Sequence, residues 1–398
     1  MPRVLRILNR LIIGGPALNA TYLTKYMAPD WETQLVIGGK DDHEQEADHL
    51  TQRLGITPVV ISEMKRAINV SEDRKAYLKL KNLIQEFKPD VVHTHAAKSG
   101  ALGRLAAHAC NVPVVVHTFH GHVFHSYFGK AKTRFFVETE RYLARKSSGI
   151  IAISDIQKKE LADTYRICPS DKIEVIPLGL DLDAFGRDGA SKRHSFRNQF
   201  GFAEDELLIT IVGRIVPVKN HLLFVKMAAE VMARTANPKL RFLIVGDGDS
   251  RLAMEEGFRN AGIAYSYFPE TGTPAQATCI SWSTEVDRVF NASDIVVLTS
   301  HNEGTPVSMI EAQATSKPVV CTNVGGVADI IEDGVTGYVV PRDDVPAFAV
   351  AVTRLVNDAA LRQSMGQQGR DAVIQRFSYQ RLVRDMDGYY RKLLGTKR

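Results

Sequence analysis

Two basic residues in the second half of the chain follow an expected strand. Arg214 and Lys219 come after an apolar run at 207–212 and precede a helical stretch. Two cations beside a helix N-terminus, at the carboxyl end of a strand, suit a diphosphate group. Either residue alone is as readily explained as an exposed basic side chain in a loop.

A loop that carries a carboxylate follows another apolar run, at 294–300. Thr305 is the expected N-cap of the next helix, and Pro306 is its expected first residue. Glu303 then lies in the loop and Glu311 on the helix. Carboxylate oxygens only accept hydrogen bonds, which suits them to sugar hydroxyls. The spacing of the two acids does not by itself indicate a binding site. Their placement at the start of a capped helix that follows a strand does favour one.

Two adjacent glycines, Gly14 and Gly15, follow the first apolar run, at 4–13. Open parallel sheets bind ligands at the carboxyl ends of their strands, where glycine lets backbone N–H groups approach a phosphate. A strand-to-helix turn can also need glycine for its geometry alone. Both interpretations stay open.

Histidines gather around two further apolar runs, at 91–95 and 114–119. They are His93, His95, His117, His120, His122 and His125. Histidine can ligate metal, but these have no acidic partner at the H-E-x-x-H spacing of a metal-binding helix. We therefore predict no metal site and expect hydrogen bonds to a sugar or phosphate. For any single histidine a structural role is the commonest outcome.

Short runs rich in Val and Ile alternate with helical stretches along the chain. The expected strands are residues 4–13, 34–37, 91–95, 114–119, 149–154, 172–176, 207–212, 240–245, 294–300, 318–322 and 337–340. Continuous apolar runs indicate strands buried on both faces, as in a parallel sheet. The alternation of strand and helix indicates a doubly wound α/β fold.

A polar, glycine-rich stretch at 178–203 is the expected domain boundary. We expect a Rossmann-like domain at 1–185, a second one at 186–376 and a cleft between them. A C-terminal helix at 377–398 could pack back on the first domain. Residues 262–283 show no clear strand or helix pattern, and the sequence suggests no function for them.

The composition, with 44% hydrophobic and 24% charged residues, is that of a soluble globular protein. No apolar run reaches the roughly 18–20 residues of a membrane span. Polar residues interrupt the N-terminal apolar stretch, which disfavours a signal peptide. The four cysteines show no C-x-x-C spacing, which favours reduced thiols and a cytoplasmic location over a zinc site.

The net charge of +5 is uneven, because residues 51–150 carry sixteen Lys and Arg against seven Asp and Glu. Basic and aromatic residues interleave here, at Lys130, Lys132, Arg134, Phe135, Phe136, Arg141, Tyr142, Arg145 and Lys146. Such a surface could bind the anionic inner face of a membrane or be a solvated amphipathic helix, and we weigh these equally. No nucleic-acid-binding module is recognisable, so nucleic acid is not an expected partner.

Together these motifs resemble the retaining glycosyltransferases of the GT-B fold, family 4, over about residues 4–377. The most specific match is to the E-G-x-P-x-x-x-x-E-A signature, by Glu303, Gly304, Pro306, Glu311 and Ala312. Gly213, Arg214 and Lys219 match the G-R-x-x-x-x-K element of the family.

The first half carries weaker matches to the same family. Residues 116–120 resemble its sugar-site histidine segment, and Gly14-Gly15 its first phosphate loop. The stretches 93–107 and 116–128 resemble the branch that builds bacterial cell-surface polysaccharides.

The resemblance implies a role for each matched side chain. Arg214 and Lys219 would neutralise the diphosphate of a nucleotide-sugar donor. Glu303 would bind hydroxyls of the donor sugar, and Glu311 would bind the ribose. His120 would contact the donor sugar near the reacting carbon.

The resemblance also implies the reaction. Backbone amides of Gly15, Gly304 and Thr305 would hold phosphate oxygens, and no metal or other cofactor would be needed. The sugar would pass, with retention of its anomeric configuration, to a saccharide or lipid-linked saccharide acceptor. The departing phosphate would help to deprotonate that acceptor.

Two other functions fit the same residues. A nucleotide-sugar epimerase on this fold would need no acceptor pocket. A non-catalytic subunit that binds a sugar nucleotide would not turn it over, although it would have no need to keep Arg214, Lys219, Glu303 and Glu311 together. A NAD-dependent dehydrogenase is disfavoured, because neither half carries a G-x-G-x-x-G turn after its first strand.

Overall fold

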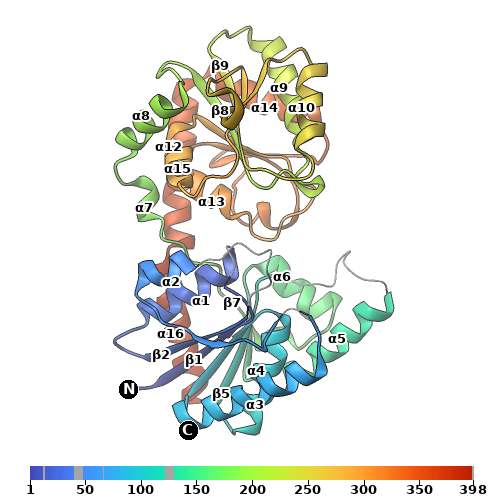
Figure 1. Cartoon of the computed structure of the whole chain (residues 1–398), viewed down its shortest axis with the longest axis vertical. Coiled ribbons are helices and arrows are strands. Elements are labelled where there is room, and N and C mark those ends of the chain that lie inside the picture. Colours follow the sequence, from blue (N-terminus) through green and yellow to red (C-terminus); the bar gives the residue numbers. More distant parts are fainter. Residues whose placement is uncertain (12–13, 40–47, 66, 122–129, 397–398) are drawn as a thin grey trace. The chain divides into compact units, whose positions relative to one another are not determined.

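The computed structural model describes residues 1–11, 14–39, 48–65, 67–121 and 130–396 (Figure 1). The chain divides into two compact units. The first unit is Met1–Leu180 with Phe377–Arg398, and the second is Asp181–Arg376. The first unit thus ends at Leu180 rather than at the expected residue 185. The reason is local, since the Leu180 N–H donates to Phe377 and its carbonyl accepts from Tyr379.

The first unit contains one sheet of seven parallel strands, in the order β3-β2-β1-β4-β5-β6-β7. The strands are β1 (Arg3–Leu8), β2 (Glu32–Gly38), β3 (Val59–Ile61), β4 (Val91–His95), β5 (Val114–Phe119), β6 (Gly149–Ala152) and β7 (Ile173–Val175). The longer helices are α1 (Gly15–Tyr26), α2 (Asp48–Leu54), α3 (Val70–Phe87), α4 (Ala97–Ala109), α5 (Lys130–Arg145), α6 (Asp155–Lys159) and α16 (Tyr379–Gly395).

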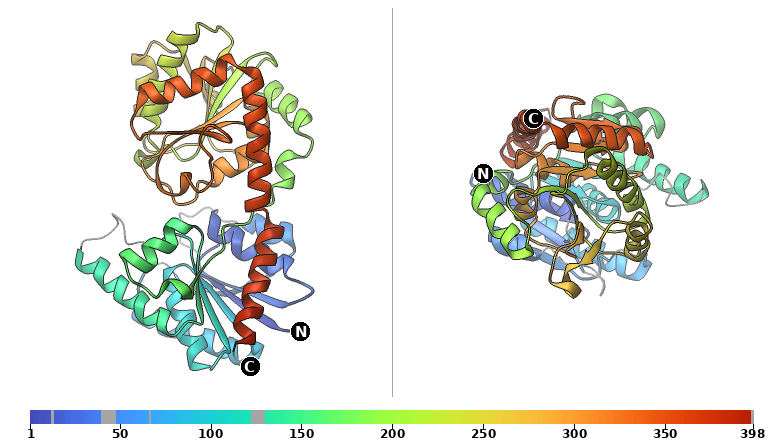
Figure 2. Two further views of the ribbon diagram at one scale, coloured as in Figure 1. Left: turned by 180° about the vertical axis from the view of Figure 1, so that it is seen from behind. Right: turned by 90° about the horizontal axis from the view of Figure 1, so that it is seen from above.

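Both faces of this sheet are covered. Val91 and Val114 pack in one core with α1 and α16, whereas the next residues, Val92 and Val115, pack in another core with α3 and α4. The C-terminal helix α16 runs along the sheet of this unit (Figure 2), and Asp387 on it accepts a hydrogen bond from the Trp31 indole at 2.7 Å. The helix is therefore part of the first unit's core.

The second unit repeats the plan with seven parallel strands in the order β10-β11-β9-β8-β12-β13-β14. The strands are β8 (Leu207–Val212), β9 (Leu240–Val245), β10 (Tyr265–Tyr267), β11 (Ala277–Cys279), β12 (Ile295–Leu298), β13 (Val319–Thr322) and β14 (Gly337–Val340). The helices are α7 (Asp183–Gly186), α8 (Gly189–Phe200), α9 (His221–Thr235), α10 (Arg251–Asn260), α11 (Phe268–Thr271), α12 (Val286–Ala292), α13 (Val307–Ala314), α14 (Val345–Asn357) and α15 (Ala359–Phe377).

The two faces of the second sheet are also buried. Ile209 and Ile211 pack in one core with α9, α10 and α14, while Leu208 packs on the opposite face with α8 and α12. The sequence-based fold class, two doubly wound parallel-sheet domains, is confirmed.

The strand predictions fail at a few places. Strands β3, β10 and β11 were not expected, and the last two lie in the irregular region 262–283. Each has only three residues, too few for a clear apolar run. Strand β1 ends at Leu8 rather than at residue 13, because the chain then turns and the Asn9 carbonyl accepts from Gly38.

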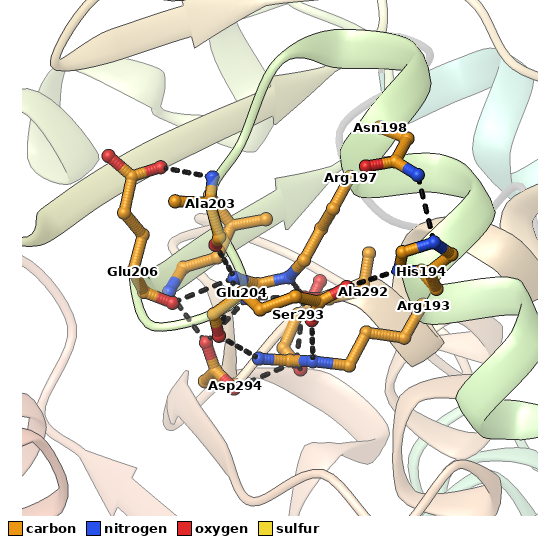
Figure 3. A network of polar contacts seen from close by, with 11 residues as sticks. Arg193, His194, Arg197, Asn198, Ala203, Glu204, Glu206, Ala292, Ser293 and Asp294 are labelled. Atoms are coloured by element: carbon orange, nitrogen blue, oxygen red, sulfur yellow. Dashed lines mark hydrogen bonds and ion pairs between the residues drawn. The ribbon is translucent and has the colours of Figure 1, made fainter.

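A polar network fixes α8 to the end of the second sheet at which β12 begins (Figure 3). The Arg197 side chain is fully buried, and its guanidinium bonds Asp294 at 2.9 Å. It also donates to the carbonyls of Ala203, Glu206 and Ala292. Arg193 adds a second ion pair to Asp294 at 3.0 Å. One arginine therefore bonds three backbone carbonyls and a carboxylate at once.

Replacing this arginine should destabilise the second unit. Arg197→Met should lower the free energy of unfolding by about 3 kcal/mol or more, since three carbonyls and Asp294 each lose a buried, charged donor. Urea unfolding followed by circular dichroism measures this. Arg187→Met, an exposed residue whose side chain has no polar partner among the described residues, should change it by less than about 0.5 kcal/mol. Equal effects of the two substitutions would contradict the assignment.

Loops at the carboxyl edge of the second sheet touch through their backbones. A Cβ atom on Gly325, which has φ +50°, would lie 1.7 Å from the carbonyl oxygen of Glu303. A Cβ atom on Gly326 would lie 2.3 Å from that of Gly304, and the Gly326 N–H donates to the same carbonyl at 3.0 Å. The loop after β13 thus supports the loop after β12 directly.

A single methyl group should disturb this contact. In Gly325→Ala, a residue with a Cβ atom must adopt a left-handed conformation, and its methyl group clashes with the Glu303 carbonyl. The clash should lower the free energy of unfolding by about 1–3 kcal/mol in addition to the conformational strain. Gly272→Ala is the matched control, because Gly272 has φ +65° and open space around it. The control should lower the free energy of unfolding only by the strain of its left-handed conformation, about 1–2 kcal/mol. Thermal unfolding of both variants compares them, and equal losses would mean that the close approach is unimportant.

Candidate functional site

The strand order of the second unit reverses between β8 and β12. Chain connections leave in opposite directions from such a point, so the loops at the carboxyl ends separate and leave a crevice for ligands. Arg214 and Lys219 follow β8, and Glu303 follows β12. The sequence-predicted residues of this unit therefore lie at the position where a doubly wound sheet binds its ligand.

Lys219 ends a short 3-10 turn, Pro217–Lys219, directly before α9. The Asn220 side chain caps α9 by accepting from the Leu223 N–H at 3.3 Å. The Lys219 side chain passes over Gly213, where a Cβ atom would be 3.8 Å from the lysine Cε. The ammonium group is thus held beside the start of a fifteen-residue helix.

The Lys219 ammonium forms an ion pair with Glu303, with 2.5 Å between Nζ and Oε1. The Ser300 hydroxyl donates to the same oxygen at 2.6 Å. The second oxygen of Glu303, Oε2, accepts no hydrogen bond from the described residues. The lysine and glutamate side chains are 24% and 10% exposed, so the pair is sheltered but reachable.

Arg214 is exposed, and its guanidinium makes no hydrogen bond or ion pair within the described ranges. The N–H groups of Gly304 and Thr305 likewise donate to no residue that the structure describes. Free donors and a free cation therefore accompany the ion pair, as an anionic ligand would require.

Helix α13 begins one residue later than expected. Its N-cap is Pro306, with no side-chain hydrogen bond, and Val307 is the first helical residue. The prediction of Thr305 as N-cap and Pro306 as first helical residue was wrong. The ψ angle of 88° at Pro306 is far from helical, so the proline stays outside the helix.

Glu311 lies on α13, and its surroundings alter its acidity. Burial, with a smaller effect from the charge of Asp287, raises the pKa of its carboxyl to about 8. The neutral form therefore prevails at pH 7, and a neutral carboxyl can donate as well as accept a hydrogen bond. No described residue forms a hydrogen bond with it.

The first unit has its own reversal point, between β1 and β4. Gly14 and Gly15 stand at the start of α1, after β1, and the Gly15 N–H is one of the free amides of a helix N-terminus. His95 ends β4, and His120 directly follows β5. The predicted residues of this unit also gather at the carboxyl edge.

The His120 ring is held by His95, with 2.9 Å between its Nε2 and the Nδ1 of His95. Burial lowers the pKa of His120 to about 3, so the ring is neutral. A hollow of about 240 Å³ beside it is lined by Pro16, Ala97, Phe119, Phe136 and Glu140, among others. His122 and His125 lie outside the described residues.

The two predicted groups belong to different units. The second unit brings together Lys219 and Glu303, with Arg214, Gly304 and Thr305 on neighbouring loops and Glu311 on α13. The first unit has Gly14, Gly15 and His120 near its reversal point. Among the described residues, no three or more His, Cys, Asp or Glu side chains are arranged to hold a metal ion.

Three supporting residues were not predicted to act at the site. Ser300 hydrogen-bonds Glu303, His95 holds His120, and Gly325 supports the Glu303 loop. His95 was visible as a strand-end histidine in the sequence. The Ser300 bond is local, since Ser300 lies three residues before Glu303, whereas the Gly325 contact depends on β13 lying beside β12, which no spacing in the sequence indicates.

Sequence profiles of two protein families match this chain. The profile described as "Glycosyltransferase Family 4" matches residues 13–184, and that described as "Glycosyl transferases group 1" matches residues 192–372. The two matches fall on the first and second units and include every site residue named above.

Individual relatives cover most of the chain. It is 28% identical to a UDP-Gal:alpha-D-GlcNAc-diphosphoundecaprenol alpha-1,3-galactosyltransferase of Escherichia coli, over 89% of each chain. It is also 28% identical to the capsular polysaccharide biosynthesis glycosyltransferase CapM of Staphylococcus aureus, over 83% of this chain and 84% of the relative.

Solved structures share the fold. A glycosyltransferase from Rickettsia africae superposes with a TM-score of 0.79 at 20% identity, over 99% of both chains. HepE from Anabaena, in complex with UDP, gives 0.78 at 18% identity, over 98% of this chain and all of that one. With the family profiles on both units and the predicted signature residues assembled at the strand ends, this chain belongs to the group 1, family 4 glycosyltransferases of the GT-B fold.

Proposed function

We propose that this enzyme transfers a sugar from a nucleotide-sugar to a lipid-linked saccharide, with retention, during the synthesis of a bacterial cell-surface polysaccharide. One observation carries the proposal. At the reversal point of the second sheet, a lysine paired with a glutamate accompanies an arginine and backbone N–H groups that have no partner among the described residues. This set of groups suits a diphosphate attached to a sugar.

In the proposed reaction, the bond between the anomeric carbon and the donor's β-phosphate oxygen breaks. The acceptor hydroxyl oxygen bonds to that carbon on the same face, and its proton goes to the departing phosphate oxygen. Charge thus accumulates on the diphosphate as the sugar becomes cationic. Preorganised cations lower the cost of that charge, and Arg214 and Lys219 would supply them without a metal ion.

The remaining site residues have binding roles in this proposal. Glu303 Oε2 is open to accept from a hydroxyl of the donor sugar, while its Oε1 is held by Lys219 and Ser300. Neutral Glu311 can both donate to and accept from the ribose hydroxyls. The amides of Gly304 and Thr305, and that of Gly15 after Gly14, would bind phosphate oxygens. His120 would contact the donor sugar.

The acceptor class rests on relatives. The Escherichia coli relative is named for a GlcNAc-diphosphoundecaprenol acceptor and a UDP-Gal donor, and the Staphylococcus aureus relative for capsular polysaccharide biosynthesis. HepE has been solved with UDP-glucose as well as with UDP. We therefore propose a nucleotide-sugar donor and a polyprenyl-diphosphate saccharide as the first substrates to test.

Removing either member of the ion pair should abolish most of the transfer. Lys219→Ala and Glu303→Ala should each lower kcat/KM by about 100-fold or more, as expected for the loss of one preorganised electrostatic contact. Radiolabelled sugar transfer to the lipid-linked acceptor measures this. Lys226→Ala is the control, because Lys226 is exposed on α9 and has no polar partner in the described ranges.

Near-normal rates in both variants would contradict the site. Thermal shift with nucleotide-sugars reports donor binding separately, since a ligand at 100 times its Kd adds about 2.7 kcal/mol of stability. Formation of an epimer from the donor alone would favour an epimerase instead. Tight binding without turnover on any acceptor would favour a non-catalytic subunit.

We further propose that the first unit binds an anionic membrane surface through α5 and the residues after it. Phe135 is 64% and Tyr142 is 49% exposed on α5, and Arg145 is exposed beside them. Arg145 borders two surface hollows, one with His108 and Lys146 and one with Arg166 and Lys172. None of the described helices combines the length and apolarity needed to cross a bilayer.

Charge reversal on this surface should weaken vesicle binding. Each basic residue at an anionic surface contributes about 1 kcal/mol, so Arg145→Glu with Lys146→Glu should reduce the partition coefficient about 30-fold or more. Sedimentation with phosphatidylglycerol vesicles at low salt measures it. The control, Arg74→Glu with Lys88→Glu, makes the same charge change at two exposed residues of the same unit. Equal losses, or no binding by the unaltered protein, would remove the membrane proposal but not the transfer reaction.

A further inference from the structure

The hollow beside His120 is lined by several elements of the first unit. It has a volume of about 240 Å³, and its lining includes Pro16 of α1, Ala97 of α4, Phe119 of β5 and Phe136 of α5. These four residues are apolar, so a molecule in the hollow must present an apolar face to them. Ligand sites of this kind take their specificity from a few polar groups placed among apolar ones.

One carboxylate interrupts this apolar lining. Glu140 of α5 borders the hollow, and its side chain is 9% exposed. Both of its oxygens accept from a single atom of Arg104, Nη2, at 3.0 and 2.8 Å. No second donor to this carboxylate lies among the described residues. A carboxylate has about four acceptor sites, so Glu140 can still accept hydrogen bonds from a ligand.

The arginine that bonds this carboxylate is itself held in place. Arg104 is fully buried, and its Nε donates to the Gly100 carbonyl at 2.8 Å. The absence of a side chain at Gly100 leaves the necessary room, because a Cβ atom there would lie 3.3 Å from Arg104 Nη2 and 2.6 Å from the His117 ring. The guanidinium is thus held between α4 and the end of β5, and it restrains Glu140.

The charges around the hollow indicate what kind of ligand fits. Arg104 and Glu140 neutralise each other, so the pair gives little net attraction for a cation. The carboxylate is the member of the pair that lines the hollow, and at short range it repels an anion. Burial lowers the pKa of His120 to about 3, so this ring adds no charge. A neutral ligand with hydroxyl groups and an apolar face fits these conditions, and a sugar ring has both.

We propose that Glu140 binds the saccharide of the acceptor by accepting hydrogen bonds from its hydroxyl groups, and that Arg104 is the positioning residue that holds the carboxylate. The inference rests on the proposed transfer, in which the donor sugar contacts His120. The hollow borders His120, so a saccharide in it would lie beside the reacting carbon. A site that bonds a hydroxyl discriminates strongly against a ligand without it, so Glu140 would contribute to the choice of acceptor.

Saccharide binding can be measured without turnover. The full-length protein is titrated with methyl α-N-acetylglucosaminide, and saturation-transfer NMR follows the signals of the sugar. Glu140→Gln keeps the size of the side chain but removes its charge, and it should raise the Kd about 10-fold or more. Glu86→Gln makes the same change at an exposed residue of α3 that has no polar partner in the described ranges, and it should leave the Kd unchanged. No binding by the unaltered protein, or the same Kd for all three proteins, would overturn the proposal.

A double substitution separates sugar binding from the neutralisation of Arg104. Glu140→Gln alone leaves the charge of Arg104 buried and unpaired, which destabilises the fold. Arg104→Met with Glu140→Gln removes both charges, and circular dichroism should show a folded protein. If the carboxylate binds the sugar, the double variant should keep the raised Kd. A return to the unaltered Kd would mean that Glu140 serves only to neutralise Arg104. If Glu140→Gln alone fails to fold, the double variant still decides the question.

Monodeoxy analogues of the same glycoside give a readout that a distorted fold would not imitate. The unaltered protein should bind at least one analogue about 10-fold more weakly than the parent glycoside, because a hydroxyl bonded to Glu140 is missing. The double variant should bind that analogue and the parent about equally, as expected when the partner of the hydroxyl is gone. Discrimination that persists in the double variant, or that is absent from the unaltered protein, would contradict the role of Glu140.

Failure of this inference and failure of the proposed transfer can be told apart. Saccharide binding that depends on Glu140, in a protein that transfers no sugar, would remove the transfer and leave the binding role standing. Where transfer is observed, Glu140→Gln should raise the KM for the acceptor and leave the KM for the donor unchanged. An unchanged KM for the acceptor would overturn the inference while the transfer stands.

Discussion

The positions of the candidate site residues in this protein depend on one constraint: both sheets are parallel and buried on both faces. Successive residues such as Val91 and Val92 pack into opposite cores, so ligand-binding side chains must stand beyond the strand ends. At the points where strand order reverses, the loops diverge and leave room. Lys219 and Glu303 are 84 residues apart in the chain, yet they meet at 2.5 Å because β8 pairs with β12 there.

The two units differ in the charge of the side chains at their strand ends. The second unit keeps charged groups at its strand ends and pairs Lys219 with Glu303, while Arg214 has no polar partner in the part of the chain that the structure describes. The first unit keeps titratable groups there too, but burial lowers the pKa of His95 and His120 and removes their charge. Charged groups suit a diphosphate, and neutral rings suit hydroxyl groups.

The sequence was informative wherever a single element carries the signal. The strands at 207–212 and 240–245 were predicted with their observed bounds, because each is a mostly apolar run with clear ends. Three-residue strands such as β10 gave no such run. The cap at Thr305 was misplaced because residue type predicts a cap, whereas the backbone angles of Pro306 decide where the helix begins.

The sequence predicted which residues form the candidate site but not the contacts between them. Residue types and motif spacing identified Lys219 and Glu303, whereas their ion pair depends on how β8 and β12 pair. The backbone contact at Gly325 is a second such case, because it exists only through the pairing of β12 with β13. Main-chain contacts of this kind hold the Glu303 loop against the loop after β13. Such contacts preorganise the acid, and a preorganised group stabilises charge without a rearrangement during the reaction.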